Sequence, residues 1–204
     1  MPVKDSAKGK TYDPHVYEVG AEKIREYAGA VGEENPVYFD RDAATEAGFR
    51  DVVAPPMFAV VYSWKAVWAP AFDSEVGMDV AKLLHASQEF VWGEPVCAGD
   101  TITTTLTVAD IYAKGPNGFY EFETVSKNQD GDEVARACVN AAGGDPRSLK
   151  RLSVQFRGMG FPEKEIVVSG GVKEERDGRT VLGPIAEQDG SKIIRNAEAE
   201  VESP

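Results

Sequence analysis

The chain has 204 residues, 42% of them hydrophobic, so it can bury the core of one good-sized domain or of a domain and part of another. It carries 34 acidic and 22 basic residues, a formal net charge of −12, and no local basic patch, which disfavours nucleic acid and anionic membranes as partners. Cys97 and Cys138 are spaced unlike a zinc site, and no apolar stretch begins the sequence. These features favour reduced thiols in a cytoplasmic protein.

The sequence predicts neither a metal site nor a membrane span. Neither His15 nor His85 has a Cys, His or carboxylate at a ligand spacing, and we expect His85, on an early strand, to lie at a surface or an interface. The longest apolar run, residues 57–69, is interrupted by Ser63 and Lys65 and is shorter than the ~20 residues that cross a bilayer. This run is typical of a helix buried inside a soluble fold.

The first part of the chain predicts a short strand, at residues 16–19, and then helices. In "AEKIREYAGAVG" apolar residues recur at helical spacing, and Gly32 is a natural stop. That apolar stripe consists of Ile24, Tyr27, Ala28 and Val31. Asp40 is expected to cap a short helix that Gly48 ends. The next segment, "VVAPPMFAVVYSWKAVWAPAF", starts with prolines and is apolar nearly all round, so we expect a helix that protein surrounds on most sides.

Beyond residue 84 the hydrophobic period changes to two, which predicts strands. Phe90 and Trp92 alternate with polar residues, and the stretch 102–108 alternates apolar residues with threonines. Two further strands, at 119–125 and 134–139, flank "NQDGD", a strong hairpin signal. A buried helix followed by long antiparallel strands predicts an α+β fold, in which a curled sheet wraps around a long central helix.

The remaining residues form an internal repeat. "VQFRGMGFPEKEIVVSGGV" is similar to "QEFVWGEPVCAGDTITTTLTV", and "EQDGSKIIRNAEAEV" is similar to "NQDGDEVARACVNA". Nothing in this second copy corresponds to the helices of residues 21–72, so we predict a domain at 1–141, a linker at 142–151 and a strands-only partial repeat at 152–204. A sheet without its helix must lean on the first domain or on a partner chain. The alternative is two runs of ordinary strands that share a common turn.

Four motifs in fixed order carry a resemblance to a known family. They are "GEENPVYFD", "AATEAGF", "VVAPPMF" and "PVCAGDTI". Together they resemble the hot-dog fold of the MaoC-like hydratases and dehydratases, and more narrowly the FAS1-like dehydratase N-terminal domain. The resemblance covers about residues 10–141. The second copy resembles the tail half of another hot-dog unit, so the resemblance implies one hot-dog domain plus a partial second hot-dog sheet that lacks its helix.

The resemblance implies a reaction. Family members add water to an acyl thioester of coenzyme A or acyl carrier protein, or remove it, in fatty acid metabolism. They interconvert trans-2-enoyl and (R)-3-hydroxyacyl chains without a metal or redox cofactor. This chemistry needs a carboxylate and an imidazole near neutrality, and a hydrogen-bond donor for the thioester oxygen. The family loop Gly-Asp-x-Asn-Pro-x-His supplies the acid–base pair, and a backbone N–H at the start of the central helix is the donor.

The matching catalytic positions in this chain are altered. Glu33 stands where the family has Asp and would be a displaced base, and Tyr38 replaces the histidine and could donate a proton or a hydrogen bond. Asn35 is retained, and we expect it to hold the loop in shape. The donor position falls on Pro56, which has no N–H.

The start of the central helix is also where the resemblance places the substrate. The N–H of Met57 or of Phe58 could replace the donor that Pro56 lacks. The candidate substrate-binding residues are Ala54, Pro55, Pro56, Met57, Phe58 and Trp64. Trp64 or Trp68 could line an acyl tunnel along the central helix, although the three tryptophans are otherwise expected in the core.

Three functions fit these altered motifs. The first is a non-catalytic, acyl-thioester-binding subunit of a heteromeric hydratase or dehydratase, in which another hot-dog subunit performs the chemistry. The second is a self-sufficient hydratase that uses Glu33 and Tyr38. The third is a non-enzymatic acyl-CoA-binding module. A hot-dog thioesterase is conceivable because a fold does not fix a function, but no nucleophile or base favours it.

Overall fold

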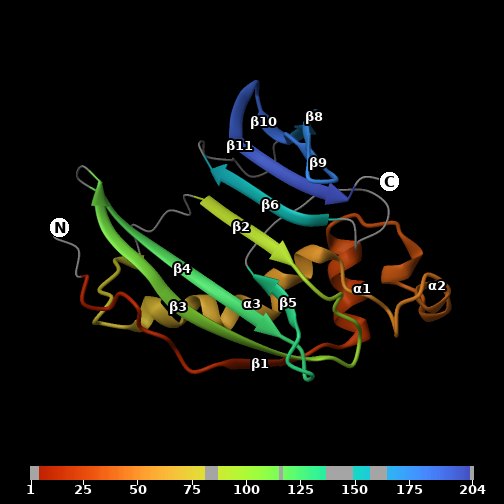
Figure 1. The fold of residues 1–204 in the computed structure, drawn as a ribbon, viewed down its shortest axis with the longest axis horizontal. Helices are drawn as coiled ribbons and strands as arrows, with labels where there is room; N and C mark the ends of the chain where they lie inside the picture. Colours follow the sequence, from red (N-terminus) through yellow and green to blue (C-terminus); the bar gives the residue numbers. More distant parts are fainter. Residues whose placement is uncertain (1–4, 81–86, 115–116, 137–148, 157–164, 203–204) are drawn as a thin grey trace.

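The computed structural model describes residues 5–80, 87–114, 117–136, 149–156 and 165–202. A continuous antiparallel sheet crosses the molecule, and the helices gather on one side of its first half (Figure 1). The α-helices are α1 (Ala21–Ala30), α2 (Arg41–Glu46) and α3 (Ala59–Trp68), and the short 3₁₀ helices are η1 (Pro36–Tyr38), η2 (Pro56–Phe58) and η3 (Ala69–Phe72). The strands are β1 (His15–Glu18), β2 (Ser87–Trp92), β3 (Thr101–Lys114), β4 (Asn117–Lys127), β5 (Glu133–Arg136), β6 (Leu149–Phe156), β7 (Val167–Ser169), β8 (Val172–Arg176), β9 (Arg179–Leu182), β10 (Ile185–Gln188) and β11 (Ser191–Glu202).

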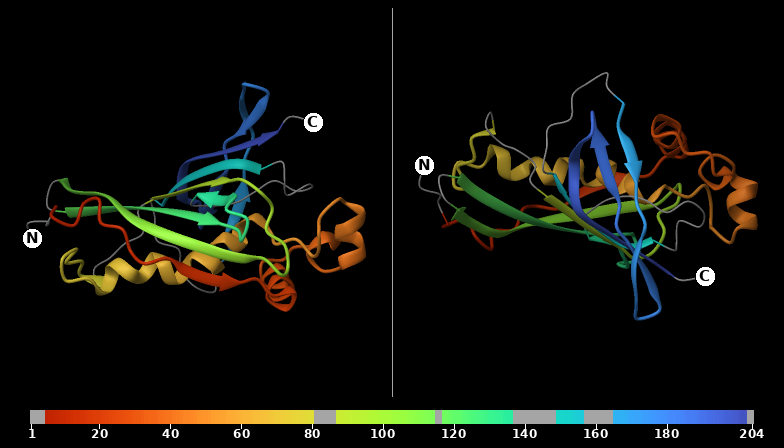
Figure 2. Two further views of the ribbon diagram at one scale, coloured as in Figure 1. Left: turned by 60° about the horizontal axis from the view of Figure 1, so that its bottom comes forward. Right: turned by 90° about the horizontal axis from the view of Figure 1, so that it is seen from above.

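The first half of the sheet has the order β1-β3-β4-β5-β2 and curls over α3 (Figure 2). Its longest pairing is the β3–β4 hairpin, in which Ile102, Leu106 and Val108 point to the helix side and are fully buried. The intervening threonines lie on the other face or are only partly covered, except Thr104, which is buried on the inner face and shares a 2.9 Å hydrogen bond with Ser126. This alternation confirms the expected α+β arrangement.

The ends of α1 and α2 follow the glycine signals in the sequence. Gly32 has φ +76°, its N–H donates to Gly29, and the next N–H, of Glu33, donates to Ala28. This is the hydrogen-bond pattern of a Schellman cap. Gly48, with φ +88°, ends α2 in the same way. One detail of the predicted stripe on α1 was wrong: Val31 caps the helix and is 53% exposed.

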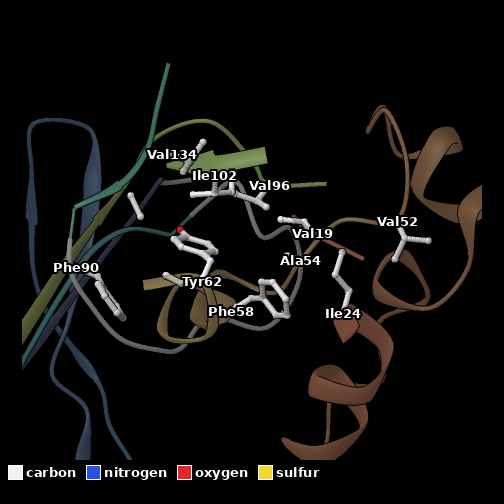
Figure 3. Close-up of a cluster of buried hydrophobic side chains, with 12 residues drawn as sticks. Val19, Ile24, Val52, Ala54, Phe58, Tyr62, Phe90, Val96, Ile102 and Val134 are labelled. Atoms are coloured by element: carbon white, nitrogen blue, oxygen red, sulfur yellow. The ribbon is translucent and has the colours of Figure 1, made fainter. Parts of the chain in front are cut away.

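The central helix is buried on one side only, which corrects the expectation that protein surrounds it. Phe58, Tyr62 and Ala66 face the sheet and are buried. Figure 3 shows Phe58 and Tyr62 below Ile102 and Val134 of the strands. On the opposite side, Trp64 is 59% exposed and Phe72 is 87% exposed. The physical reason is that a single sheet layer covers one side of a helix, and the described residues supply no second layer.

The second half of the sheet repeats the strand order of the first from β2 to β3, and its described residues include no helix. Outward from the centre, β6 pairs with β11, and β11 pairs with both β10 and β9. β10 then pairs with β7, and β9 pairs with β8. The pairs β9–β10 and β7–β8 therefore take the places of β4 and β3. The hairpin turns also match, because Gly131 and Gly190 both have positive φ. This topology confirms a partial second hot-dog sheet without its helix.

The two half-sheets meet along β2 and β6, which pair antiparallel. Gln88 and Val154 begin the matching segments "QEF" and "VQF", and they lie opposite each other in the ladder. Equivalent residues therefore face one another across a local two-fold relation. Next to them, Phe90 lies opposite Leu152 on the helix side of the sheet. The edge of β2 is thus closed by the repeat of the same chain.

The apolar inner face of the second half-sheet leans on the first domain, as expected from the sequence. Leu152, Val154, Ala197 and Ala199 are buried together, and Trp92 of β2 packs against them.

The predicted domain boundaries stay a prediction, with one difference in the linker. β6 begins at Leu149, inside the range 142–151 that we expected to be a linker. The rest of that range up to residue 148, together with His85 and Cys138, lies outside the described residues. In the described part of the chain, no helix is long and apolar enough to cross a membrane.

Candidate functional site

The loop that carries Glu33, Asn35 and Tyr38 is built as a structural turn. The Asn35 side chain accepts a hydrogen bond from the Val37 N–H at 3.2 Å and so caps η1. This contact gives Asn35 the loop-shaping position expected from the sequence. The backbone N–H of Glu33 belongs to the Schellman cap of α1, and its side chain is half-buried. The backbone of this loop is therefore held by its own hydrogen bonds.

Tyr38 points into an apolar cluster. It is 4% exposed and is buried with Val37, Phe49, Val53 and Cys97. It therefore has little of the solvent access that a proton-transfer group uses. Burial also raises the pKa of the Cys97 thiol, which disfavours the reactive thiolate. The position that holds histidine in the family is therefore part of the packing here.

The start of the central helix offers a poor oxyanion site. Pro56 has no N–H, and its carbonyl accepts a 2.9 Å hydrogen bond from the Trp92 Nε1. The N–H of Phe58, one of the two expected substitutes, donates to the Pro55 carbonyl at 2.8 Å and is therefore engaged. Met57 lies in the first turn of η2, where N–H groups have no partner within the helix. Met57 thus keeps the role of candidate donor.

A small cavity lies between the start of the central helix and the end of β2. Its volume is about 40 Å³, and two of its walls are Tyr62 of α3 and Trp92 of β2. The lining residues are Val53, Ala54, Pro55, Pro56, Phe58, Ala59, Tyr62, Trp92, Gly93, Glu94, Pro95, Val96 and Val134. Among these, Glu94 is the single carboxylate, and it is exposed. The lining residues that the structure describes therefore include no carboxylate–imidazole pair.

The cavity gathers some of the predicted residues and leaves out others. Of the six predicted substrate-binding residues, Ala54, Pro55, Pro56 and Phe58 line it, whereas Met57 and Trp64 do not. Glu33, Asn35 and Tyr38 are also absent from the lining. The nearest link to their loop is Val53, whose N–H donates to the Val37 carbonyl at 3.2 Å. The loop therefore abuts the cavity wall without contributing a side chain to it.

Aromatic rings hold the wall at Phe58 in place. The Phe58 ring makes edge contacts with Tyr17, Tyr27 and Tyr62 at centroid distances of 5.6 to 6.3 Å. Such pairs contribute about 0.5–1.5 kcal/mol each beyond the burial of their area. The wall is therefore rigid, and widening the cavity there would require several rings to move together.

Trp64 lies in a separate, open hollow on the outer side of α3. It makes an edge contact with Trp68 at 5.4 Å, and the hollow, of about 370 Å³, is completed by Lys65, Ala69 and Phe72. The structure therefore separates Trp64 from the other predicted substrate-binding residues. The alternative expectation of a core position for Trp64 is wrong, because its side chain is mostly exposed.

The motif "PVCAGD" builds a structural corner beside the cavity. Asp100 is 1% exposed, accepts the Cys97 N–H at 2.8 Å and pairs with Arg50 at 2.9 Å. The hydrogen bond from Arg50 to Asp100 raises the pKa of Arg50. Backbone hydrogen bonds on both sides of this corner join Val19, just after β1, to Gly99 and Asp100. The motif thus fastens β1 and the start of β3 to each other.

Sequence reasoning missed several cavity residues. Tyr62, Trp92, Gly93, Glu94 and Val134 line the cavity from segments that are distant in the chain. One available signal was Gly93, which directly follows a strand, where a glycine often marks a close backbone approach. No group of three or more His, Cys, Asp or Glu side chains suited to a metal was found among the residues that the structure describes.

A family model matches residues 6–137, and its description is "FAS1-like, dehydratase domain region". Among curated proteins, a UPF0336 protein of Saccharopolyspora erythraea is 41% identical over 138 residues, which are 67% of this chain and 88% of that protein. A UPF0336 protein of Streptomyces avermitilis is 38% identical over 138 residues and is covered to 92%. Each match therefore spans about two thirds of this chain and most of the relative's own length.

Solved structures match both the first domain and the whole chain. The HadBC (3R-hydroxyacyl-ACP dehydratase) complex of Mycobacterium tuberculosis contains a chain that is 28% identical, with a TM-score of 0.57, covering 66% of this chain and 96% of that one. A MaoC-like dehydratase covers 98% of this chain and 99% of its own, with a TM-score of 0.85 and 16% identity. A MaoC-like dehydratase of Phytophthora capsici covers 98% of both chains, with a TM-score of 0.71 and 16% identity. The last two similarities show the fold.

Proposed function

The chain belongs to the FAS1-like dehydratase domain family within the MaoC-like hot-dog proteins, and from this premise we propose that it is the non-catalytic, acyl-thioester-binding subunit of a heteromeric enzyme. The enzyme would be an (R)-specific enoyl-CoA hydratase or 3-hydroxyacyl-thioester dehydratase. The observation that carries the proposal is the position of Tyr38, which is packed in an apolar cluster and is absent from the cavity lining.

The chemistry of hydration explains why this position matters. A water molecule and a proton must be delivered to neighbouring carbons of the acyl chain, and a carboxylate and an imidazole tuned near neutrality perform this step. Among the described residues, the cavity lining has one exposed carboxylate and no histidine, and Pro56 gives no N–H to a developing enolate. A second subunit with the family's Asp and His would supply what this chain lacks. The proposed reaction uses no metal or redox cofactor.

The size of the cavity also favours a shared site. The cavity of about 40 Å³ is far smaller than typical ligand pockets, which measure ~300–1,000 Å³. Most of an acyl chain would therefore lie in space that a partner helps to form. The similarity to a chain of the HadBC complex supports a hot-dog subunit as that partner.

The test is co-expression with a hot-dog subunit whose loop reads Asp-x-Asn-Pro-x-His. We expect no crotonyl-CoA hydration by the purified chain and turnover by the complex. Within the complex, Glu33→Gln and Tyr38→Phe should leave kcat within about twofold, because neither side chain takes part in the chemistry. Replacement of the partner's Asp by Asn should reduce kcat by about 100-fold or more.

Two results would replace this proposal with an alternative function. Turnover by the chain alone, lost in Glu33→Gln, would show a self-sufficient hydratase. Tight binding of acyl-CoA with no turnover, even in the presence of the partner, would show a non-enzymatic binding module.

A further inference from the structure

The second half-sheet has an open edge where the first half-sheet has a covered one. In the first half, β1 pairs with the start of β3, at residues Thr101–Thr104. By the internal repeat, Val167 and Val168 of β7 correspond to Thr101 and Ile102. β7 pairs with β10 on its inner side, and among the described strands none pairs with its outer side. Within the described residues, the repeat therefore has no strand that covers this edge.

This edge is apolar and exposed. Val167 is 54% exposed, Val168 is 67% exposed, and the neighbouring Ile166 and Val172 are 49% and 65% exposed. The stretch "IVVSGGV", residues 166–172, contains no charged residue, although 27% of the chain is charged. It also has no proline or lysine, the residues that proteins use to protect free sheet edges. Figure 2 shows this strand, in light blue, at the outer side of the second half-sheet.

The other places where strand pairing could extend the sheet are closed or blunted. The β2 edge is filled by β6. β1, at the opposite end of the sheet, includes the charged Glu18, and β8, for which β9 is the pairing partner among the described strands, includes Lys173, Glu174, Glu175 and Arg176. Among the described strands, β7 is therefore the apolar edge that is open to an added strand.

We propose that the β7 edge pairs with the β7 edge of a second copy of this chain. Antiparallel pairing of a strand with itself generates a two-fold axis, so each copy covers the open edge of the other and the assembly closes. With a chain of net charge −12, the uncharged stretch 166–172 is where two copies can approach with little repulsion. The partner strand takes the place on β7 that β1 takes on β3.

The test uses the full chain and two matched lysine substitutions. Sedimentation equilibrium of the unaltered protein should give a dimer at micromolar concentration. Val168→Lys should weaken the dimer by at least about tenfold, because it places a charge in a desolvated contact. Val16→Lys alters a valine that is 53% exposed on β1 at the other end of the sheet, and it should leave the dimer unchanged. Circular dichroism of each variant shows whether it is folded.

A second measurement tests the same contact by cross-linking. Val168→Cys should form a disulfide-linked dimer on mild oxidation, whereas the unaltered chain under the same conditions should not. A monomeric unaltered protein, an equal effect of both lysine substitutions, or a dimer that Phe72→Ser dissociates and Val168→Lys does not would overturn the proposal. A monomer that binds another hot-dog subunit through β7 would overturn it too. Because no substrate is used, this result is separate from the test of the proposed function.

Discussion

Two glycines show how the backbone environment of a single residue decides whether a side chain fits. A Cβ atom at Gly93 would lie 2.0 Å from the carbonyl oxygen of Glu133, because β2 ends there in close contact with the start of β5. At Gly29, in α1, the same atom would meet nothing within 4 Å. Both glycines are exposed, so exposure alone does not distinguish them.

Gly93→Ala should therefore lower the free energy of unfolding by at least about 1–3 kcal/mol, the usual cost of overpacking, because backbone must move to admit the methyl group. Gly29→Ala should raise it by up to about 1 kcal/mol, since alanine loses less backbone entropy in a helix. Urea unfolding of the two variants beside the unaltered protein measures both changes. Equal stability of the variants would contradict the close approach at Gly93.

The turn formed by residues 32–40 was predictable from the sequence, but the direction of its side chains was not. The order of the motifs predicted the turn, and Asn35 makes the kind of local hydrogen bond that its side chain favours. Nothing local fixes whether Tyr38 points to a cavity or into packing. That choice depends on Phe49 and Cys97, which come from later segments and close the cluster around it.

At the scale of elements, a polar latch ties the N-terminal arm to the end of the central helix. Lys10 contacts Asp73 at 2.7 Å and Glu75 at 2.6 Å, and the Tyr12 hydroxyl donates to Asp73 at 2.6 Å. The hydrogen bonds from Lys10 and then Tyr12 lower the pKa of Asp73 to about 2. Burial and the bond to Asp73 raise the pKa of Tyr12 to about 12.

The latch should fail in acid. The pKa of Asp73 in the folded protein is below its ordinary value of 3.8, so the latch stabilises the fold above that pH and is lost as pH falls towards 2. Protection of the Gly9 and Tyr12 amide hydrogens, corrected for intrinsic exchange, should therefore drop over this range. The Lys8–Asp110 pair, which also lowers its carboxyl pKa, acts in the same direction. Asp73→Asn should reduce protection already at neutral pH, and unchanged protection would contradict the latch.

Helix ends and strand alternation were predictable because short-range signals determine them. Gly32, Asp40 and Gly48 act within a few residues, and the threonine alternation of β3 reflects a two-residue period. The exposure of one side of α3 was not predictable. The sequence of an apolar helix surface is the same whether this chain or another molecule covers it. Trp64 and Phe72 are the residues where that difference appears.

At the scale of the whole molecule, the repeat was visible in the sequence, and its consequence for the sheet was not. The matching turns predicted a second set of strands without a helix. Which edges those strands would meet depends on long-range pairing. The structure pairs β6 with β2, and no strand among the described residues pairs with the outer edge of β7. The long-range pairing of strands therefore determines that the β2 edge is closed and that the β7 edge has no partner among the described strands.

Trp92 has a consequence for how the protein unfolds. Its ring packs in the core of the first domain and also against the alanine-lined face of the second half-sheet, and its indole N–H holds the start of the central helix. Loss of either half would expose this shared side chain, so the two halves should melt together. Differential scanning calorimetry should show one transition whose calorimetric and van't Hoff enthalpies agree, and Trp92→Ala should separate it into two. Two transitions in the unaltered protein would mean that the half-sheets are thermodynamically independent.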